Sequence, residues 1–319
     1  MRKLMMGIAA AVCAGMLMGG TAMAEELLPG GGTNILYCIT PSTSNPFFGT
    51  EQIIAEKVGT ELGYEVKCFS HDDDAAKQLE LFEAAITDKA AAIICDNAGA
   101  DASIEAIQKA YDAGIPTFLI DREINQTGLA VSQIVADNAQ GAAAIAEVWV
   151  EAMEYEGKYA ELLGLESDTN CHVRSENYHS VIDEYPDLEM VAQQSANWDQ
   201  TEAYEKTEAI LQANPEITGI ICGNDTMACG AVQACIDAGR DDIKVIGLDG
   251  SDEAAAYIKT GEMVGTALQQ IAQITEDAVN EADAYLKGTA PEEEKQLVPC
   301  IAITADNVDN LSSFVYTEK

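Results

Sequence analysis

The chain has 319 residues, with 54 acidic and 17 basic side chains and a net charge of −37. A chain this acidic repels phosphate groups, which argues against nucleic-acid binding and against attachment to anionic lipid. The charge places no restriction on neutral solutes, and the length is sufficient for two domains.

Residues 1–24 have the three parts of a secretory signal peptide. Met1-Arg2-Lys3 is basic, the stretch from Leu4 to Met23 has no acid, and Ala22-Met23-Ala24 is a small-residue cleavage site. Cleavage removes Arg2 and Lys3, which changes the net charge from −37 to −39. We therefore predict export to the periplasm, or to another extracytoplasmic, envelope-associated location. A retained membrane anchor is the alternative.

The first part of the remaining chain alternates between apolar strand-like runs and helical segments. This βαβαβαβ order is typical of a parallel sheet with helices on both faces. The expected strands are 33–40, 64–70, 91–96 and 115–121, and the expected helices are 49–63, 71–88 and 101–113.

The alternation restarts after a strand at 129–136 and builds a second unit of similar size. Its expected helices are 138–156, 172–184, 200–213, 225–238 and 251–260, and its expected strands are 159–165, 188–195, 217–222, 243–248 and 263–268. A helix at 270–287 and a last strand around 297–304 are left over from the second unit. The simplest arrangement lets the chain cross between the units more than once, which would form a hinge beside a cleft.

Eight cysteines follow residue 24, and several of them lie inside apolar strand-like runs. A free thiol in such a run behaves as a small hydrophobic side chain. No C-x-x-C motif occurs, so a zinc or redox site is unsupported. Export would permit disulfides, but we predict mostly free, buried thiols.

Polar and aromatic residues follow the ends of many expected strands. In open α/β sheets, ligands bind at the carboxyl ends of the strands. Aromatic rings pack on the C–H faces of sugars, whereas carboxylate, guanidinium and amide groups hydrogen-bond their hydroxyls. The candidate ligand-binding residues are Asn45, Phe47, Phe48, Asp121, Arg122, Arg174, Trp198, Asn224, Asp249 and Gln269.

These residues occur in the order N-P-F-F (45–48), D-R (121–122), Arg174, W-D (198–199), G-N-D (223–225), G-L-D-G (247–250) and Gln269. The pattern resembles the periplasmic sugar-binding proteins of ABC importers, and ribose-binding proteins most closely, from about Thr33 to Thr304. The resemblance implies the type I periplasmic binding protein architecture: two doubly wound, Rossmann-like parallel-sheet lobes joined by a three-strand hinge.

The resemblance also implies the division of the chain. The signal peptide is 1–24, the N-terminal lobe 25–136 plus 270–300, and the C-terminal lobe 137–269 plus 301–319, with hinge segments near 136–137, 269–270 and 298–301. Phe47, Phe48 and Trp198 would pack on the sugar, and the other seven candidates would hydrogen-bond it.

Three positions depart from the ribose-binding pattern. Trp198 replaces a Phe, His172 occupies the position of a second Arg, and Ser44 precedes Asn45 where a second Asn is usual. The identity of the sugar therefore stays open, with ribose first and allose-, galactose- or xylose-like sugars behind it.

Each candidate has a structural alternative. Asp121-Arg122 is a surface ion pair in isolation, Phe47-Phe48 could be core, Asp249-Gly250 a turn, Arg174 a solvated helix residue, and Trp198-Asp199 packing plus a helix cap. For His71-Asp72-Asp73-Asp74, capping of a helix is favoured over metal binding. Asp225 and Ser251 are interpreted as N-caps of their helices.

We therefore predict an exported protein that captures a monosaccharide and delivers it to an ABC importer permease, without cofactor, metal or catalytic residues. A sensor that presents its ligand to a chemoreceptor or histidine kinase would use the same cleft. A sugar enzyme is less supported, because His71, His172 and His179 form no Ser-His-Asp order or H-E-x-x-H motif. A DNA-binding repressor is excluded by the signal peptide and the acidity.

Overall fold

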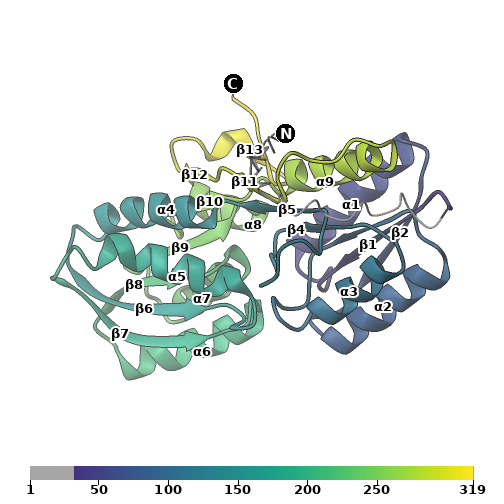
Figure 1. Ribbon diagram of the computed structural model, residues 1–319. Helices are drawn as coiled ribbons and strands as arrows, with labels where there is room; N and C mark the ends of the chain where they lie inside the picture. The colour runs from purple at the N-terminus through teal and green to yellow at the C-terminus, as the bar shows by residue number, and fades with distance from the viewer. Residues whose placement is uncertain (1–31, 319) are drawn as a thin grey trace, which may run out of the picture.

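The computed structural model describes residues 32–318, which form two α/β lobes lying side by side (Figure 1). The predicted signal peptide lies outside the described residues. Within residues 32–318, no helix has both the length and the hydrophobicity needed to span a membrane.

The N-terminal lobe contains a parallel sheet of six strands in the order β11-β5-β4-β3-β1-β2. Its strands are β1 (Ile35–Thr40), β2 (Glu65–Ser70), β3 (Ala92–Cys95), β4 (Thr117–Ile120), β5 (Ser132–Ala136) and β11 (Lys295–Val298). Its helices are α1 (Pro46–Glu61), α2 (Ala75–Thr87), α3 (Ile104–Asp112) and α9 (Ile271–Leu286).

Alternation along β1 explains why both faces of this sheet are covered. Leu36 and Cys38 belong to the larger hydrophobic cluster, whereas Tyr37 and Ile39 belong to a second cluster with Phe82 of α2. Successive side chains of a strand point to opposite faces, so an uninterrupted apolar strand needs helices on both sides. Helices α1 and α9 pack together, as do α2 and α3.

The C-terminal lobe contains a second six-stranded sheet in the order β12-β10-β9-β8-β6-β7. Its strands are β6 (Gly157–Leu163), β7 (Leu188–Ser195), β8 (Ile217–Cys222), β9 (Lys244–Asp249), β10 (Gly265–Leu268) and β12 (Ile301–Thr304). Its helices are α4 (Asn138–Ala152), α5 (Thr169–Ile182), α6 (Gln200–Ala213), α7 (Asp225–Asp237) and α8 (Asp252–Thr260). The predicted fold class, with two parallel-sheet lobes, is confirmed.

The prediction of one continuous last strand at 297–304 is wrong. The structure has β11 in the first sheet and β12 in the second, where β12 pairs antiparallel with β10. Pro299 lies between them, and proline has no N–H to continue a ladder. A short 3-10 helix (Val308–Asn310) and the hairpin β13 (Leu311–Ser312) and β14 (Val315–Tyr316), which were not predicted, follow.

The chain crosses between the lobes three times. It leaves the first sheet after β5, returns after β10 through α9, which packs on α1, and leaves again between β11 and β12. These crossings lie together between the lobes in Figure 1. The exact lobe boundaries stay a prediction, and residues 25–31 and 319 lie outside the described part of the chain.

The predicted state of the cysteines is also confirmed. All eight cysteines in the described part of the chain are free, and every one except the half-buried Cys68 is buried.

Candidate functional site

All ten predicted ligand-binding residues line one cavity between the lobes. An eleventh residue, Asp168, completes the lining. The N-terminal lobe contributes Asn45, Phe47, Phe48, Asp121 and Arg122, and the other lining residues are Asp168, Arg174, Trp198, Asn224, Asp249 and Gln269. The lining is therefore shared between the two sheets, as the strand ends predicted.

Two asparagines reach the cavity from the N-termini of helices. Asn45 caps α1, where its Oδ1 accepts a hydrogen bond from the Phe47 N–H at 3.0 Å. Asn224 caps α7 in the same way, accepting from the Met227 N–H at 2.9 Å. Because capping uses the oxygen, the Nδ2 donors of both amides are available to a ligand.

The interpretation of Asp225 as an N-cap is wrong, because Asn224 caps α7. The buried Asp225 carboxylate instead accepts hydrogen bonds from the Gly250 N–H at 2.8 Å, the Ser251 N–H at 2.7 Å and the Thr266 Oγ1 at 2.6 Å. It thereby holds the turn that presents Asp249. Ser251 does cap α8, as predicted.

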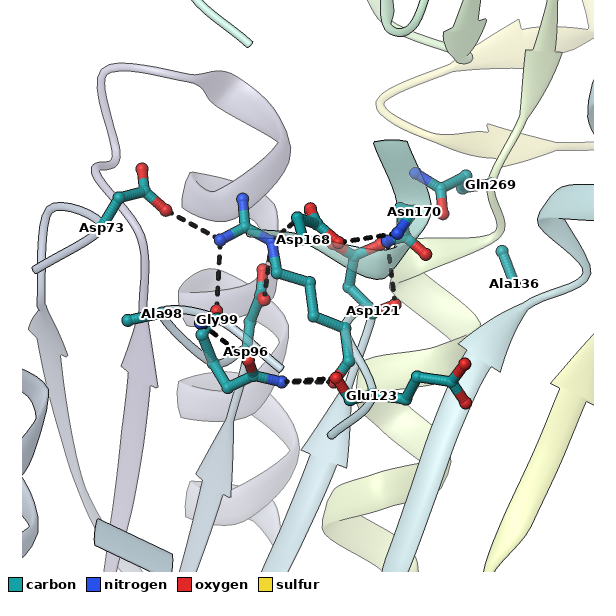
Figure 2. A network of polar contacts seen from close by, with 12 residues as sticks. Asp73, Asp96, Ala98, Gly99, Asp121, Glu123, Ala136, Asp168, Asn170 and Gln269 are labelled. Atoms are coloured by element: carbon teal, nitrogen blue, oxygen red, sulfur yellow. Dashed lines mark hydrogen bonds and ion pairs between the residues drawn. The ribbon is translucent and has the colours of Figure 1, made fainter. Parts of the chain in front are cut away.

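Arg122 occupies the centre of a dense polar network at the end of β4. Its Nη1 donates to Asp73 at 2.7 Å and to the Asn97 carbonyl at 3.1 Å. Its Nε forms ion pairs with Asp168 at 2.9 Å and Asp96 at 3.4 Å. Figure 2 shows Asp73, Asp96 and Asp168 converging on this one guanidinium group. The acidic cluster before α2 is therefore structural, with Asp73 on Arg122 and Asp74 capping the helix.

Each lobe holds one arginine against one aromatic ring. The Arg122 guanidinium lies 5.3 Å from the centre of the Phe48 ring, and that of Arg174 lies 5.2 Å from the centre of the Trp198 ring. This geometry supports cation–π attraction and limits the motion of both partners. Phe47 packs edge-on against Phe48, with ring centres 5.5 Å apart.

Hydrogen bonds also hold Arg174, so it is not a solvated helix residue. Its Nε donates to Asn138 Oδ1 at 2.7 Å and its Nη1 to the Gly223 carbonyl at 3.0 Å. Its Nη1 also lies 3.5 Å from Asp249, which accepts from Gln269 Nε2 at 2.8 Å. These contacts fix the orientation of the polar groups on this side of the cavity.

Trp198 rests on two glycines that follow strands of the second sheet. A Cβ atom placed on Gly164 would lie far inside the ordinary 3.4–4 Å contact distance from three atoms at the outer edge of the indole. One placed on Gly223 would come within 2.9 Å of the same ring. Gly164 and Gly223 therefore leave room for the large Trp198 ring. The sequence predicted Trp198 in the site but not the two glycines that accommodate it.

Several buried polar atoms around the cavity lack a protein partner among the described residues. They include Asp121 Oδ1, Gln269 Oε1 and Trp198 Nε1. Buried polar atoms are normally hydrogen-bonded, and leaving one unpaired costs about 1–3 kcal/mol. One donor and two acceptors thus remain for a small molecule that can both accept and donate.

Burial raises the pKa of Asp121 to about 6, against the opposing effect of Arg174. It also raises the pKa of Asp249 well above its ordinary value, again against Arg174. Two other fully buried carboxyl groups, Glu51 and Asp96, also have pKa values that burial raises. Arg122 and Arg174 oppose this effect of burial, so the carboxyl and guanidinium groups of the cavity depend on one another for their charge.

Asp168, Asp73 and Asp96 were not predicted from the sequence as residues of the site. The predicted start of α5 was residue 172, whereas the helix begins at Thr169 and Asp168 is its N-cap. An Asp between a strand and a helix is a recognisable capping signal. The pairing of these acids with Arg122 has no local signal, because the partners lie far apart in the chain.

The comparisons with known proteins agree with this geometry. Residues 36–290 match the family model described as periplasmic binding protein domain. A D-apiose import binding protein of Actinobacillus succinogenes is 52% identical over 282 residues, which cover 88% of this chain and 91% of the relative. A ribose import binding protein of Bacillus subtilis is 31% identical, covering 77% and 79% of the two chains.

A solved structure shares the arrangement of both lobes. It is an ABC transporter periplasmic solute binding protein from Actinobacillus succinogenes with bound D-allose. Its TM-score is 0.82 at 30% identity, with 86% of this chain and 99% of that chain covered. The type I architecture expected from the sequence is therefore confirmed, and the chain belongs to the periplasmic binding protein family.

Proposed function

We propose that the protein binds a neutral monosaccharide in the cavity between its lobes and delivers it to an ABC importer, with D-apiose as the first candidate ligand. The 52% identity with a D-apiose import binding protein supports this choice over ribose, whose binding proteins match at 31% or less among the relatives compared. The sequence-based ranking, which put ribose first, is revised accordingly.

The observation that carries the proposal is the set of unpartnered buried atoms, Asp121 Oδ1, Gln269 Oε1 and Trp198 Nε1. A sugar hydroxyl donates one hydrogen bond and accepts others, so it can satisfy both kinds of atom. The Phe47, Phe48 and Trp198 rings supply apolar faces for the C–H surface of the sugar. All ten predicted residues are assigned to this ligand.

The charge balance of the lining favours a neutral ligand. Three carboxyl groups, Asp121, Asp168 and Asp249, face two guanidinium groups, and each guanidinium is already paired with protein carboxylates. No positive charge is left over to compensate a sugar acid or a sugar phosphate, so an anionic ligand would be buried with an uncompensated charge.

Capture follows from the division of the lining between two lobes. A sugar contacts both sets of residues only when the lobes are together, so its binding energy favours the closed arrangement. The three chain crossings act as the hinge. The closed, loaded form is the one that the importer would receive. The sensor alternative has no specific observation in its favour, and neither does a chemoreceptor or kinase partner.

Isothermal titration calorimetry with D-apiose, D-ribose, D-allose and the sugar acid D-ribonate tests the proposal. We expect the tightest binding for D-apiose and none for D-ribonate. Asp249→Asn should weaken binding, whereas the matched control Asp242→Asn, whose side chain pairs with Arg240 on the surface, should not. Absence of heat with every neutral sugar would refute the proposal.

Two further parts of the proposal need separate measurements. Family membership supports an extracytoplasmic location, and N-terminal sequencing of the exported protein tests cleavage after Ala24. The family consists of solute-binding proteins, so we propose no catalytic activity. Recovery of unaltered D-apiose after prolonged incubation with the protein is the expected result, and a new product would contradict it.

A further inference from the structure

Asp168 makes a contact that differs in kind from the other contacts of Arg122. Asp73, Asp96 and the Asn97 carbonyl belong to the same lobe as Arg122, whereas Asp168 lies at the start of α5 in the other lobe. Its Oδ2 is 2.9 Å from Arg122 Nε, and both side chains are at most 3% exposed. Figure 2 shows Asp73 and Asp168 approaching the guanidinium from different sides.

The cap of α5 orients the Asp168 carboxylate for this contact. Its Oδ1 accepts a hydrogen bond from the Asn170 N–H at 2.9 Å, which leaves Oδ2 to face Arg122. The same helical turn makes a second contact across the lobes, from Asn170 Nδ2 to the Asp121 carbonyl at 3.2 Å. A third joins the Ala100 N–H to the Ser167 carbonyl at 3.2 Å.

The contacts of Arg122 respond differently to separation of the lobes. Opening would break the ion pair with Asp168 but would keep the contacts with Asp73, Asp96 and the Asn97 carbonyl, because they lie within one lobe. Arg122 therefore stays oriented in the open form, while Asp168 loses its partner. The contacts of the guanidinium use Nε and Nη1, so Nη2 can bind a sugar while the ion pair persists.

We propose that Asp168 is an interlobe latch, which stabilises the closed arrangement through Arg122 whether or not a sugar is bound. The sugar-release part of this inference rests on the proposed function, but the effect on the sugar-free protein does not. The latch slows the escape of a captured ligand and raises the closed fraction of the sugar-free protein. Asp168 is thus a positioning residue that acts through Arg122.

Asp168→Asn tests the latch with little risk to the fold. Asparagine is as good an N-cap as aspartate, so α5 keeps its cap while the charge facing Arg122 is lost. Asp73→Asn is the matched control, because it removes a carboxylate from the same guanidinium within one lobe. Small-angle X-ray scattering of the sugar-free proteins measures how far the lobes open.

We expect a larger radius of gyration for Asp168→Asn than for the original protein, and no such increase for Asp73→Asn. Stopped-flow measurement of sugar release should show an increase of about tenfold for Asp168→Asn, since affinity changes within one site lie mainly in the dissociation rate. Unchanged sugar-free scattering would overturn the latch, even with faster release, because Asp168 would then act only as a ligand contact. Scattering is informative even where no tested sugar binds, so failure of the latch and failure of the proposed function are distinguishable.

Discussion

Gly164→Ala is the sharpest test of the aromatic side of the cavity. The added Cβ would collide with three atoms at the outer edge of the Trp198 ring, far inside the ordinary 3.4–4 Å contact distance. The indole or the segment after β6 would have to move by more than about 1 Å. Gly164 has no positive φ, so the alanine itself causes no backbone strain.

The displaced indole would occupy part of the space that the sugar needs. Loss of the stacking contact and of the Nε1 hydrogen bond would together cost about 1.5–3 kcal/mol, or ten- to a hundredfold in affinity. Calorimetry with D-apiose measures the loss. Gly49→Ala in α1 is the control, because the nearest atom to its new Cβ is 3.9 Å away.

A double-mutant cycle identifies the cause. Phenylalanine at position 198 lacks the outer ring atoms that meet the added methyl group, so Gly164→Ala combined with Trp198→Phe should bind better than the sum of the two losses predicts. Additive losses would mean that the substitution acts by another route. Unchanged affinity for Gly164→Ala alone would refute the assignment of Trp198 to the ligand.

Three other outcomes follow from the structure. Burial raises the pKa of Asp121 to about 6, and sugar hydroxyls that donate to this carboxyl group favour its ionised form. The affinity measured by calorimetry should therefore be full above this pH and fall by up to about tenfold per pH unit below it. Asp121→Asn should show no such slope. The two tryptophans are Trp149 in the core and Trp198 in the cavity. A sugar-induced change in intrinsic fluorescence should therefore vanish in Trp198→Phe. Trp149→Ala should instead lower the free energy of unfolding by about 3–5 kcal/mol. The hydrogen bond to Glu161 raises the pKa of His179 to about 9. The contribution of this pair to the free energy of unfolding should therefore be full below about pH 6.5 and lost as the pH rises to 9. Urea unfolding across that range measures this pH dependence, which should be absent in His179→Gln.

The fold and most of the cavity lining were predictable because both depend on local patterns. An apolar run such as 115–120 predicts a buried strand, and the residues after it must then lie at the carboxyl edge of a parallel sheet. Asp121 and Arg122 follow this rule. Asn45 and Asn224 also follow it, since helix capping fixes each of them at the same edge.

The remaining features depend on contacts between distant residues. Asp225 was expected to cap α7, yet it bonds Gly250, Ser251 and Thr266, which the sheet brings beside it. The division of the last strand into β11 and β12 depends on which lobe each half joins. The ion pair of Asp168 with Arg122 depends on how two separately folded lobes meet, and no periodicity within either lobe encodes that.

The arrangement of charges explains how a site with five ionisable lining residues can select an uncharged sugar. Arg122 and Arg174 are each stacked on a ring and paired with carboxylates before any ligand arrives. Their orientation therefore costs little entropy at the moment of binding, and their charges are already compensated. A neutral polyol needs only to complete the hydrogen bonds left open, whereas a charged analogue would disturb a balance that the protein has already set.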